Sequence, residues 1–474
     1  MLNQDTYPPT LAADEQALLE SSLVDYALAS GAVVRSDAAA GAVHVPLTLF
    51  PSPFPRALFE RAVAIQKDFH TLYMNVANDE AFIADVVAQM DGADEFTARV
   101  WAMYETVKAE GIAQPLGLGI FRSDYLLDFK GAAPAIKQVE FNTISASFGG
   151  LSTRAAGVHR HLARTGRYGD SPLFTDAAMP ANPAARDLAA GLAAAHKAYG
   201  VADALVLFVV QPGERNAFDQ RWLEYELADG GVAVRRATLA EATTLCALDA
   251  DRTLRFRGRE VAVVYYRCAY TPDDFPTETE WDGRLVLERS RAIKCPTLLT
   301  HLAGAKKIQQ VLAGETLLAK YAGDAAPRLA ETFADIFPLT ATSAEGARAR
   351  ELIATCPERY VLKPQREGGG NNVYRDKIPE FLASVAPEKW SGYILMELIE
   401  PPADVANAII RAGSTRSGNI ISELGIFGWA LWDTTSGAVL GSENAGWLVR
   451  TKFTDSEEGG VAAGFGSVDS VLLV

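Results

Sequence analysis

In the first third of the chain, hydrophobic residues recur at three- and four-residue spacing, which is typical of amphipathic helices. Prolines and glycines interrupt this pattern and separate its segments. The pattern predicts helices at residues 14–29, 56–76, 79–90 and 96–110. Residues 117–128 and 135–142 lose the helical period and gain β-branched and aromatic side chains, which predicts two strands separated by a polar turn.

The middle of the chain alternates between strands and a helix. A continuous apolar run at residues 204–210 predicts a buried strand. A helix at 218–228 and a strand at 232–236 follow it, and this β-α-β order predicts a small parallel sheet. With a further strand at 260–266, residues 201–303 are predicted to form an α/β lobe inserted between the first third and the remainder.

The last third also mixes helical and extended patterns. An alanine- and glutamate-rich helix is predicted at residues 343–355, followed by a strand that Pro364 ends. A glycine-rich loop comes next, before strands at 392–397 and 420–428. The whole pattern indicates the α/β class.

Length and charge narrow the class of protein. A chain of 474 residues is too long for one hydrophobic core, so we expect two or three lobes. The formal net charge of −15 repels phosphate backbones and anionic lipids, and no apolar run approaches the length of a membrane-spanning helix. The first ten residues carry an acid and two prolines instead of the basic start and apolar core of a signal peptide. We therefore expect a cytosolic protein that binds neither nucleic acid nor a membrane.

The spacing of cysteines and histidines disfavours a zinc or redox centre. The four cysteines include no C-x-x-C pair, which fits a reducing compartment. His159 and His161 flank an arginine, and we expect them on a solvated helix face instead of at a metal.

The segment K-P-Q-R-E-G-G-G-N-N at residues 363–372 is the first candidate for chemistry. Its three consecutive glycines cost conformational entropy, but they let backbone amides approach a ligand closely. Lys363 offers a donor to phosphate oxygens, and Glu367 offers an oxygen ligand to magnesium. The spacing matches neither Walker A nor G-x-G-x-x-G. The segment is therefore interpreted as a nucleotide-binding loop or a flexible turn.

A second candidate is V-E-F-N-T-I-S-A-S-F-G-G, which begins at Val139. On a strand, Glu140 and Asn142 project from one face, where their oxygens would share one magnesium. Ser145 and Ser147 alternate likewise if the extended conformation continues. A plain polar strand face ending in a glycine turn would carry the same residues.

Basic residues form two pairs, Lys306 with Lys307 and Arg450 with Lys452. Such residues are usually solvated charges. Phosphoryl transfer, however, needs positive groups and a positioned metal around the transferred phosphate, and the pairs complete that inventory.

Together these motifs resemble those of the eukaryotic glutathione synthetases along nearly the whole chain. The matching segments are R-S-D-Y at 122–125, E-F-N-T-I-S-A-S-F-G-G at 140–150, E-R-N-A-F-D-Q-R at 214–221, K-P-Q-R-E-G-G-G-N-N at 363–372, S-E-L-G-I-F-G at 422–428, R-T-K at 450–452 and G-G-V-A-A-G at 459–464. One departure is Cys268 and Ala269, where an acid and a glycine are typical of animal members. It affects only the shape of that loop, and we expect Cys268 to be a packed thiol.

The resemblance implies a circularly permuted ATP-grasp fold of the α/β class. Its body is expected at residues 1–200 and 304–474, with a parallel α/β substrate-binding domain inserted at 201–303. A lid is expected at about residues 338–420, with its glycine-rich loop at 366–372.

The resemblance also implies roles for individual residues. Two magnesium ions would be held by Glu140, Asn142 and Glu367. ATP would contact Glu140, Lys306, Lys363, Gly368, Gly369, Gly370, Asn371, Asn372, Tyr374, Met396, Glu397, Leu398, Ile399, Glu423, Lys452 and Glu458. The peptide and amino-acid substrates would contact Arg122, Ile144, Ser145, Ala146, Ser147, Glu214, Arg215, Asn216, Gln220, Arg267, Tyr270, Arg450, Val461 and Ala462. The catalytic groups would be Arg122, Arg450 and Lys363.

The implied reaction is ATP-dependent ligation of γ-glutamylcysteine to glycine by a homodimer, through an acyl phosphate. Two alternatives stay open. One is a sister ligase that uses β-alanine or serine, because a single methylene changes discrimination by only about 1–3 kcal/mol. The other is a non-catalytic nucleotide-binding scaffold with the same fold.

Overall fold

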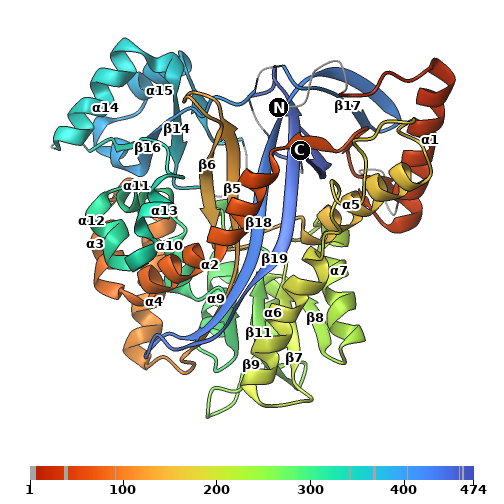
Figure 1. Ribbon diagram of the computed structural model, residues 1–474. Coiled ribbons are helices and arrows are strands. Elements are labelled where there is room, and N and C mark those ends of the chain that lie inside the picture. Colours follow the sequence, from red (N-terminus) through yellow and green to blue (C-terminus); the bar gives the residue numbers. More distant parts are fainter. Residues whose placement is uncertain are drawn as a thin grey trace.

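The computed structural model describes residues 7–36, 41–90, 92–340, 343–366, 370–402, 404–457, 459–461 and 464–474. Its helices, labelled in Figure 1, are α1 (Ala13–Ser30), α2 (Arg56–Asn78), α3 (Glu80–Ala88), α4 (Glu95–Glu110), α5 (Gly149–Arg164), α6 (Ala184–Tyr199), α7 (Ala217–Asp229), α8 (Leu239–Leu245), α9 (Glu278–Glu288), α10 (Leu298–Ala303), α11 (Lys306–Leu312), α12 (Glu315–Ala322), α13 (Ala326–Ala330), α14 (Ala344–Thr355) and α15 (Lys377–Ser384).

Its strands are β1 (Val33–Arg35), β2 (Ala42–His44), β3 (Leu47–Thr48), β4 (Ser52–Phe54), β5 (Leu116–Asp128), β6 (Ala135–Asn142), β7 (Leu205–Val209), β8 (Ala233–Ala237), β9 (Cys246–Leu248), β10 (Leu254–Phe256), β11 (Arg259–Tyr266), β12 (Ile293–Cys295), β13 (Ile336–Pro338), β14 (Tyr360–Pro364), β15 (Val373–Tyr374), β16 (Tyr393–Glu397), β17 (Ala406–Arg411), β18 (Ser414–Asp433), β19 (Val439–Phe453), β20 (Ser467–Asp469) and β21 (Val471–Leu473). The predicted α/β class is confirmed.

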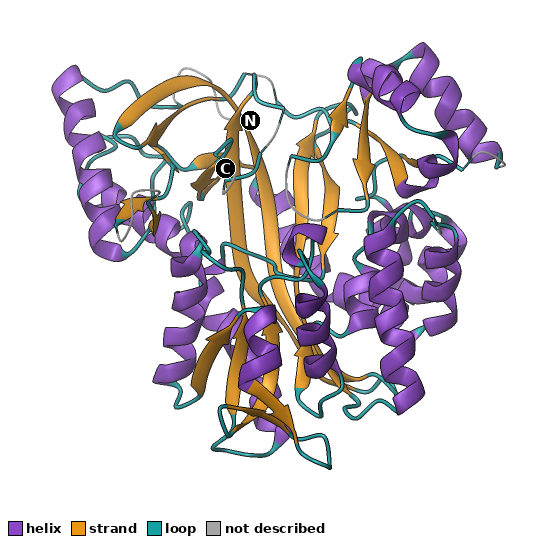
Figure 2. Cartoon of the chain, turned by 180° about the vertical axis from the view of Figure 1, so that it is seen from behind, coloured by secondary structure: helices purple, strands orange, loops and turns teal. Residues whose placement is uncertain are grey.

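A 13-stranded sheet runs through the molecule in the order β17-β3-β20-β19-β18-β5-β12-β11-β10-β9, with β6 on β5 and β7-β8 on β11. Its long strands β18 and β19 extend from the upper to the lower end in Figure 1, and Figure 2 shows helices on both sides of them. Alternation along β18 explains this layering. Leu424 and Ile426 pack into the core that contains Phe69 of α2, whereas Phe427 and Leu431 pack into the core that contains Leu188 of α6.

The parallel strands β8, β7, β11 and β12 confirm the predicted β-α-β order, but they do not form a separate sheet. Strand β12 pairs with β5 of the antiparallel region through Lys294 and Gly117. The predicted small sheet is therefore an extension of the large one.

A second sheet of 4 strands, in the order β13-β16-β14-β15, carries α14 and α15. It has its own core, which includes Leu352, Leu362, Ile378 and Leu395. We call residues 336–397 the lid region. The predicted helix at 343–355 and strand at 392–397 match α14 and β16 to within one residue.

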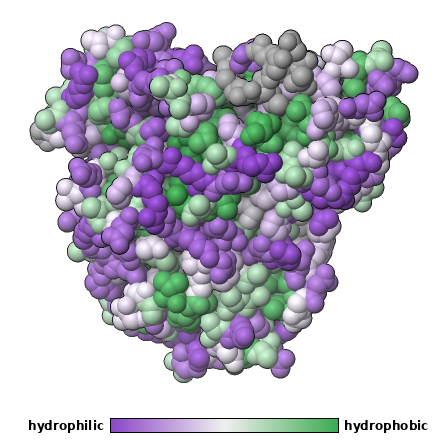
Figure 3. Space-filling model, viewed as in Figure 1, coloured by the Kyte–Doolittle hydropathy of each residue, from purple (hydrophilic) through white to green (hydrophobic). Residues whose placement is uncertain are grey.

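Surface and burial correct one prediction about histidine. Figure 3 shows a face covered mostly by polar side chains, with apolar ones in separate patches. His159, however, is buried, and its Nδ1 lies 2.7 Å from the hydroxyl oxygen of Tyr168. The expectation of a solvated face was wrong for His159, because Tyr168 covers it.

Among the described residues, no helix combines the length and apolar content needed to cross a membrane.

Candidate active site

A cavity of about 540 Å³ lies between the upper part of the large sheet and the lid region. Its walls bring together residues from distant parts of the chain. They are Arg122, Leu126, Val139, Glu140, Asn142, Ile144, Ser145, Ser147, Phe148, Tyr270, Lys306, Val361, Lys363, Arg366, Asn372, Tyr374, Arg375, Met396, Glu397, Leu398, Ile399, Pro401, Ile421, Glu423, Arg450, Lys452, Thr454, Ser456, Glu457, Gly459, Gly460 and Val461.

The body wall is built by alternate residues on neighbouring strands. In the pairing of β5 with β6, Arg122 lies opposite Asn142 and Asp124 lies opposite Glu140. The guanidinium of Arg122 donates to both carboxylate oxygens of Asp124 at 2.6 and 2.8 Å. Asn142 donates from Nδ2 to the same carboxylate at 3.0 Å. The two predicted residues Glu140 and Asn142 therefore share a face, as period two requires.

Strands β18 and β19 add a second ion pair to this wall. Glu423 pairs directly with Arg450, whose Nε donates to the Glu423 carboxylate at 2.9 Å. Arg450 also donates to Asp124 at 3.0 Å. Room for these groups comes from Gly425, where an added Cβ would lie only 2.8 Å from Arg122 Cδ and from an Asp124 oxygen. Asp124 thus links the arginines of β5 and β19.

Two lysines approach Glu140 from other elements. Lys306, the first residue of α11, donates to the Glu140 carboxylate at 2.8 Å. Lys363 on β14 donates to the Val139 carbonyl at 3.0 Å. Both lysines are buried, as is Lys307, so of the two interpretations left open for Lys306 and Lys307, that of a solvated charge pair does not hold. The alternation Val361, Lys363 on the cavity side explains why β14 delivers this lysine.

Charge dominates the electrostatics of Glu140. Burial alone would raise its pKa. The positive charges of Lys306, Lys363 and Arg450 outweigh burial and hold the pKa of Glu140 well below its ordinary value. Glu140 is therefore a stable anion in the ligand-free protein.

The neighbouring pair responds differently. Burial raises the pKa of Glu423, an effect that Arg450 opposes and that Asp124 and Glu140 reinforce. Burial acts to lower the pKa of Arg450, but the surrounding carboxylates raise it above the ordinary value. Arg450 therefore stays charged and supplies positive charge to the body wall of the cavity.

The oxygens of Glu140 and Asn142 fit a magnesium ion that also binds phosphate oxygens. Both known contacts of Asn142 are donated by Nδ2, so Oδ1 is the atom that it offers to a cation. Magnesium typically takes only one or two carboxylates and completes its shell with water and substrate phosphates. Within the described residues, no three His, Cys, Asp or Glu side chains gather into a metal-holding group. The expected third ligand, Glu367, lies outside the described residues.

The structure describes residues 363–366 and 370–372 of the glycine-rich motif. Gly368 and Gly369, like Glu458 and Ala462, lie outside the described residues. Asn372 lines the cavity and donates from Nδ2 to the hydroxyl oxygen of Tyr374 at 3.3 Å. Gly370 and Asn371 are described but do not line the cavity.

The segment 396–399 borders the cavity at the end of β16. Met396 is buried, and the carboxylate of Glu397 accepts from Arg359 at 2.7 Å and pairs with Lys130. This side chain is thus engaged by cations of the protein. Contacts of Glu397 with a ligand would have to come from its backbone.

The segment after β6 turns away from extended geometry. The strand ends at Asn142 as predicted, and Ser145 has a φ of +53°, so the condition for alternation of Ser145 and Ser147, a continued extended conformation, is not met. Arg267 supports this turn, because Nη1 donates to the Ala146 carbonyl at 3.0 Å and Nη2 donates to the Ser147 hydroxyl at 2.9 Å.

Several predicted substrate residues lie outside the described cavity lining. They are Ala146, Glu214, Arg215, Asn216, Gln220 and Arg267. Glu214 accepts from Gln220 at 2.9 Å, and Asp219 accepts from the backbone of Phe148 at 2.8 Å. Asp219 thus supports the end of the turn, while Tyr270 and Val461 do line the cavity. Cys268 is a buried thiol whose pKa burial raises well above the ordinary value, as expected for a packed side chain.

The lining or supporting side chains that sequence reasoning missed include the charged residues Asp124, Arg366 and Glu457. Asp124 is fully buried and stands two residues after Arg122, a spacing that could have revealed it. Arg366 lies inside the glycine-rich motif, where a cation next to a phosphate loop was the available signal. Glu457 pairs with Lys377 of the lid region at 2.7 Å, and the sequence holds no local sign of this contact.

Comparisons with known proteins agree with this geometry. The family model for "Eukaryotic glutathione synthase, ATP binding domain" matches residues 13–473. The chain is 40% identical to human glutathione synthetase over 477 residues, covering 97% of this chain and 98% of that protein. It is 38% identical to the Xenopus laevis glutathione synthetase over 480 residues, with 99% of both chains covered. A glutathione synthetase-like effector from Globodera pallida in its apo form superimposes with a TM-score of 0.78 at 26% identity, covering 98% of each chain.

Fold, cavity and relatives together define an ATP-dependent ligase. ATP is its co-substrate. The chain belongs to the eukaryotic glutathione synthase family, and its function is that of a glutathione synthetase. The resemblance inferred from the motifs is thereby confirmed.

Proposed function

We propose that this protein ligates γ-glutamylcysteine to glycine in the described cavity, on a circularly permuted ATP-grasp fold. The observation that carries the proposal is the placement of Glu140 among Lys306, Lys363 and Arg450 in one cavity. A carboxylate surrounded by cations suits the phosphates of ATP, because a bound cation and the lysines together offset their charge.

The nucleotide would lie with its phosphates near Lys306 and Lys363 and its base along residues 396–399. Val361 and Met396 belong to a small apolar cluster on this side of the lid region, which suits an aromatic base. The glycine-rich loop, including Gly368, Gly369, Gly370 and Asn371, would then cover the phosphates. Tyr374, Glu423, Lys452 and Glu458 complete the proposed nucleotide contacts.

Magnesium would be held by Glu140, Asn142 and Glu367, and it would supply charge neutralisation between the phosphate groups. In the ligand-free protein, Lys306 occupies one oxygen of Glu140. The other carboxylate oxygen of Glu140 would then face the metal, and Lys306 would lie within reach of the phosphates.

The dipeptide would lie across the turn at 144–147, next to Arg122. The guanidinium of Arg122 is fixed by Asp124 and donates to the Ser147 carbonyl at 3.1 Å, so it connects this turn to the charged wall. Arg267 holds the turn from behind. The residues Glu214, Arg215, Asn216, Gln220 and Tyr270 would bind the far end of the peptide after rearrangement of the side chains that now bond each other.

In the reaction, a cysteinyl carboxylate oxygen attacks the γ-phosphorus, which forms an acyl phosphate and releases ADP. The amine of glycine then attacks the acyl carbon, and inorganic phosphate leaves as the amide forms. Arg450 and Arg122 would stabilise the oxyanion of the tetrahedral intermediate, since both are preorganised by carboxylates of the same wall. Val461 and Ala462 would border glycine.

The proposal extends to the organisation of the whole protein. The body would comprise residues 1–200 and 304–474, the substrate domain 201–303 and the lid about 338–420. We further propose a cytosolic homodimer that needs magnesium and binds neither nucleic acid nor membranes.

ADP release tests the function directly. The purified protein is given ATP, magnesium and γ-glutamylcysteine, with glycine, β-alanine, serine or no acceptor, and the peptide product is identified by mass. We expect product and stoichiometric ADP with glycine. A preference for β-alanine or serine would replace glycine in the proposal, and ATP binding without product would show a scaffold instead.

A further inference from the structure

The loop after β11 meets the end of β7 beside the large cavity. The two strands are parallel neighbours in which Tyr266 pairs with Val209, so Tyr270 and Gln211 follow them at the same edge of the sheet. Tyr270 lines the large cavity and also a small one of about 30 Å³. Its hydroxyl oxygen lies 3.2 Å from Nε2 of Gln211. The described part of the chain offers this hydroxyl no second hydrogen-bond partner.

Asp274, four residues after Tyr270, accepts hydrogen bonds at both carboxylate oxygens. Its Oδ1 accepts from Nε2 of Gln211 at 2.7 Å, and its Oδ2 accepts from the backbone N–H of Tyr270 at 3.1 Å. The backbone N–H groups of Ala269 and Thr271 also donate to it, and all these donors oppose the rise in its pKa that burial causes. Ala269 has a φ of +71°, a left-handed conformation that alanine rarely adopts, and the bonds to Asp274 stabilise it.

The chemistry of these groups fixes the direction of each hydrogen bond. A carboxylate can only accept, so the amide of Gln211 must turn its NH2 group toward Asp274. The same nitrogen faces Tyr270, whose oxygen therefore accepts as well. Burial and the charge of Asp274 raise the pKa of Tyr270 to about 12, so the hydroxyl keeps its proton at neutral pH. That proton is left for an acceptor in the cavity.

We propose that Asp274 is a positioning residue for peptide recognition: through the amide of Gln211 it makes the Tyr270 hydroxyl a donor to an oxygen of the peptide substrate. This inference rests on the proposed function, in which Tyr270 binds the far end of the peptide. A carboxylate or carbonyl oxygen fits such a donor, whereas an ammonium group does not. Neither Asp274 nor Gln211 belongs to the described lining of the large cavity, so both act through Tyr270.

The test is the full-length Asp274→Asn variant, which keeps the size of the side chain and removes its charge. The backbone N–H groups still need an acceptor, so the asparagine would offer them Oδ1 and turn Nδ2 toward Gln211. The Gln211 amide then flips, and the Tyr270 hydroxyl donates to its Oε1 instead of into the cavity. We expect the KM for γ-glutamylcysteine to rise about tenfold or more, because an oxygen of the peptide loses its donor. The KM for ATP and kcat should each change by less than about threefold.

Gln211→Met determines whether the orientation of the amide matters. Without the amide, the Tyr270 hydroxyl can rotate and still donate to the peptide, so we expect the KM for γ-glutamylcysteine to rise only about threefold. Added to Asp274→Asn, this change removes the flipped amide, and the KM should fall below that of Asp274→Asn alone. A double variant worse than both single variants would show that Asp274 only holds the loop, which overturns the proposal.

Tyr270→Phe removes the hydroxyl through which the effect is proposed to act. In that background, Asp274→Asn should raise the KM for γ-glutamylcysteine by less than about twofold, and a rise as large as in the wild-type background would overturn the proposal. Circular dichroism and the unfolding temperature check that each variant folds. If Asp274→Asn does not fold, Gln211→Met alone decides, and a wild-type KM in that variant would contradict the proposal.

Asp273→Asn is the matched control. Asp273 is the neighbouring residue of the same loop, and it is exposed to solvent. The substitution removes the same charge, so we expect wild-type KM values for ATP, γ-glutamylcysteine and glycine. A rise equal to that in Asp274→Asn would assign the effect to the net charge of the loop and overturn the proposal. Absence of product in the wild-type protein would refute the proposed function itself.

Discussion

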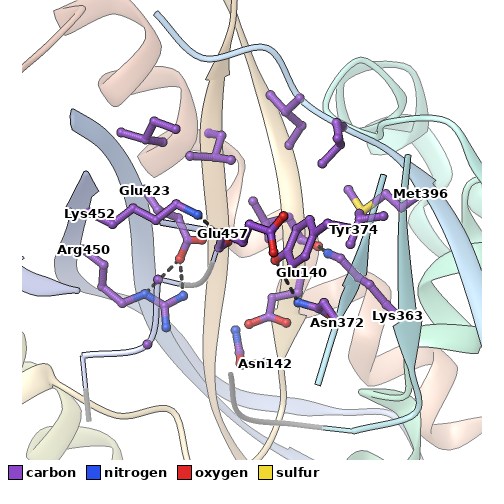
Figure 4. A pocket seen from close by; sticks show the side chains of 18 of the residues that line it. Glu140, Asn142, Lys363, Asn372, Tyr374, Met396, Glu423, Arg450, Lys452 and Glu457 are labelled. Carbon is purple, nitrogen blue, oxygen red and sulfur yellow. Dashed lines mark hydrogen bonds and ion pairs between the residues drawn. The ribbon is translucent and has the colours of Figure 1, made fainter. Parts of the chain in front are cut away.

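The two walls of the cavity differ in how their functional groups are held. On the body wall, Glu140, Glu423 and Arg450 stand on strands of the large sheet, and Arg450 bonds to Asp124, which is completely buried. On the lid wall, Lys363 stands on a four-stranded sheet with its own small core. Figure 4 shows the two sets facing each other.

This difference separates two tasks of a ligase. The groups whose charges must stay at fixed positions lie on the large sheet. Deformation of this sheet would disturb both main cores. Groups that are proposed to cover the nucleotide belong to the smaller sheet, which has a core of its own. We therefore expect substitutions on the body wall to affect mainly the chemical step, and substitutions on the lid wall to affect mainly the conformation of the site.

The largest effect is expected for Glu140→Gln. Loss of this anion leaves three cations without their shared partner and removes a proposed metal ligand, so kcat should fall by about a thousandfold or more. Glu260→Gln, which alters a carboxylate bonded to Tyr199 at 2.8 Å in the parallel region, is the control and should retain activity. Steady-state ADP release measures both variants. Retention of more than a tenth of wild-type turnover by Glu140→Gln would contradict the site.

A pair of core truncations separates the walls by stability. Ile426→Ala in the main core and Ile378→Ala in the lid core each remove a fully buried side chain, at a cost of about 2–5 kcal/mol. We expect Ile426→Ala to lower the global unfolding temperature. Ile378→Ala should instead increase hydrogen exchange at residues 343–397 with a smaller global change. Equal global losses in both would show that the lid region is not a separate unit.

The pH dependence of stability tests the charge state assigned to Glu140. The pKa of Glu140 is lowered in the folded protein, so its charge adds stability above the unfolded value of 4.5 and loses it as pH falls below that value. The difference in unfolding temperature between wild type and Glu140→Gln should therefore be smaller at about pH 4 than at about pH 6, because these two values lie below and above the pKa of the unfolded carboxyl group. A difference that grows on acidification would reverse the assigned sign.

The smallest effect is expected on the lid surface. Arg348 pairs with Glu351 at 2.7 Å on α14, but both side chains are more than half exposed. Arg348→Ala should change the free energy of unfolding by less than about 0.5 kcal/mol and leave kinetics unaltered. A larger loss, measured by denaturant unfolding, would mean that α14 has a partner other than solvent.

Local pattern predicted most elements but not their assembly. The helix at 56–76 and the strand at 135–142 match α2 and β6 closely, because the hydrophobic period of a helix or strand can be recognised from consecutive residues. Strand β12 joins β5 through one pairing, between Lys294 and Gly117. Neither segment carries a sequence pattern that identifies the other as its partner. The parallel strands form as predicted, but they belong to the large sheet.

The site shows the same division. Glu140 and Asn142 share a face as their spacing predicts, and Lys306 and Lys363 reach the same cavity. Arg366 and Asp94 are 272 positions apart, so their contact has no sequence signature. The roles assigned to Arg267 and to residues 214–220 remain predictions.

Strand order has a consequence for synthesis of the protein on the ribosome. Strand β20 lies between β3 and β19, and β21 pairs with β4, so early and late segments of the chain are interleaved. Strands β7, β8 and β11 pair with one another, and the described strands of the lid region pair only among themselves, so these parts can form as they emerge, whereas β12 pairs back to β5. The neighbourhood of Arg450 must wait until residues 467–473 have left the exit tunnel, and catalytic competence is therefore acquired last.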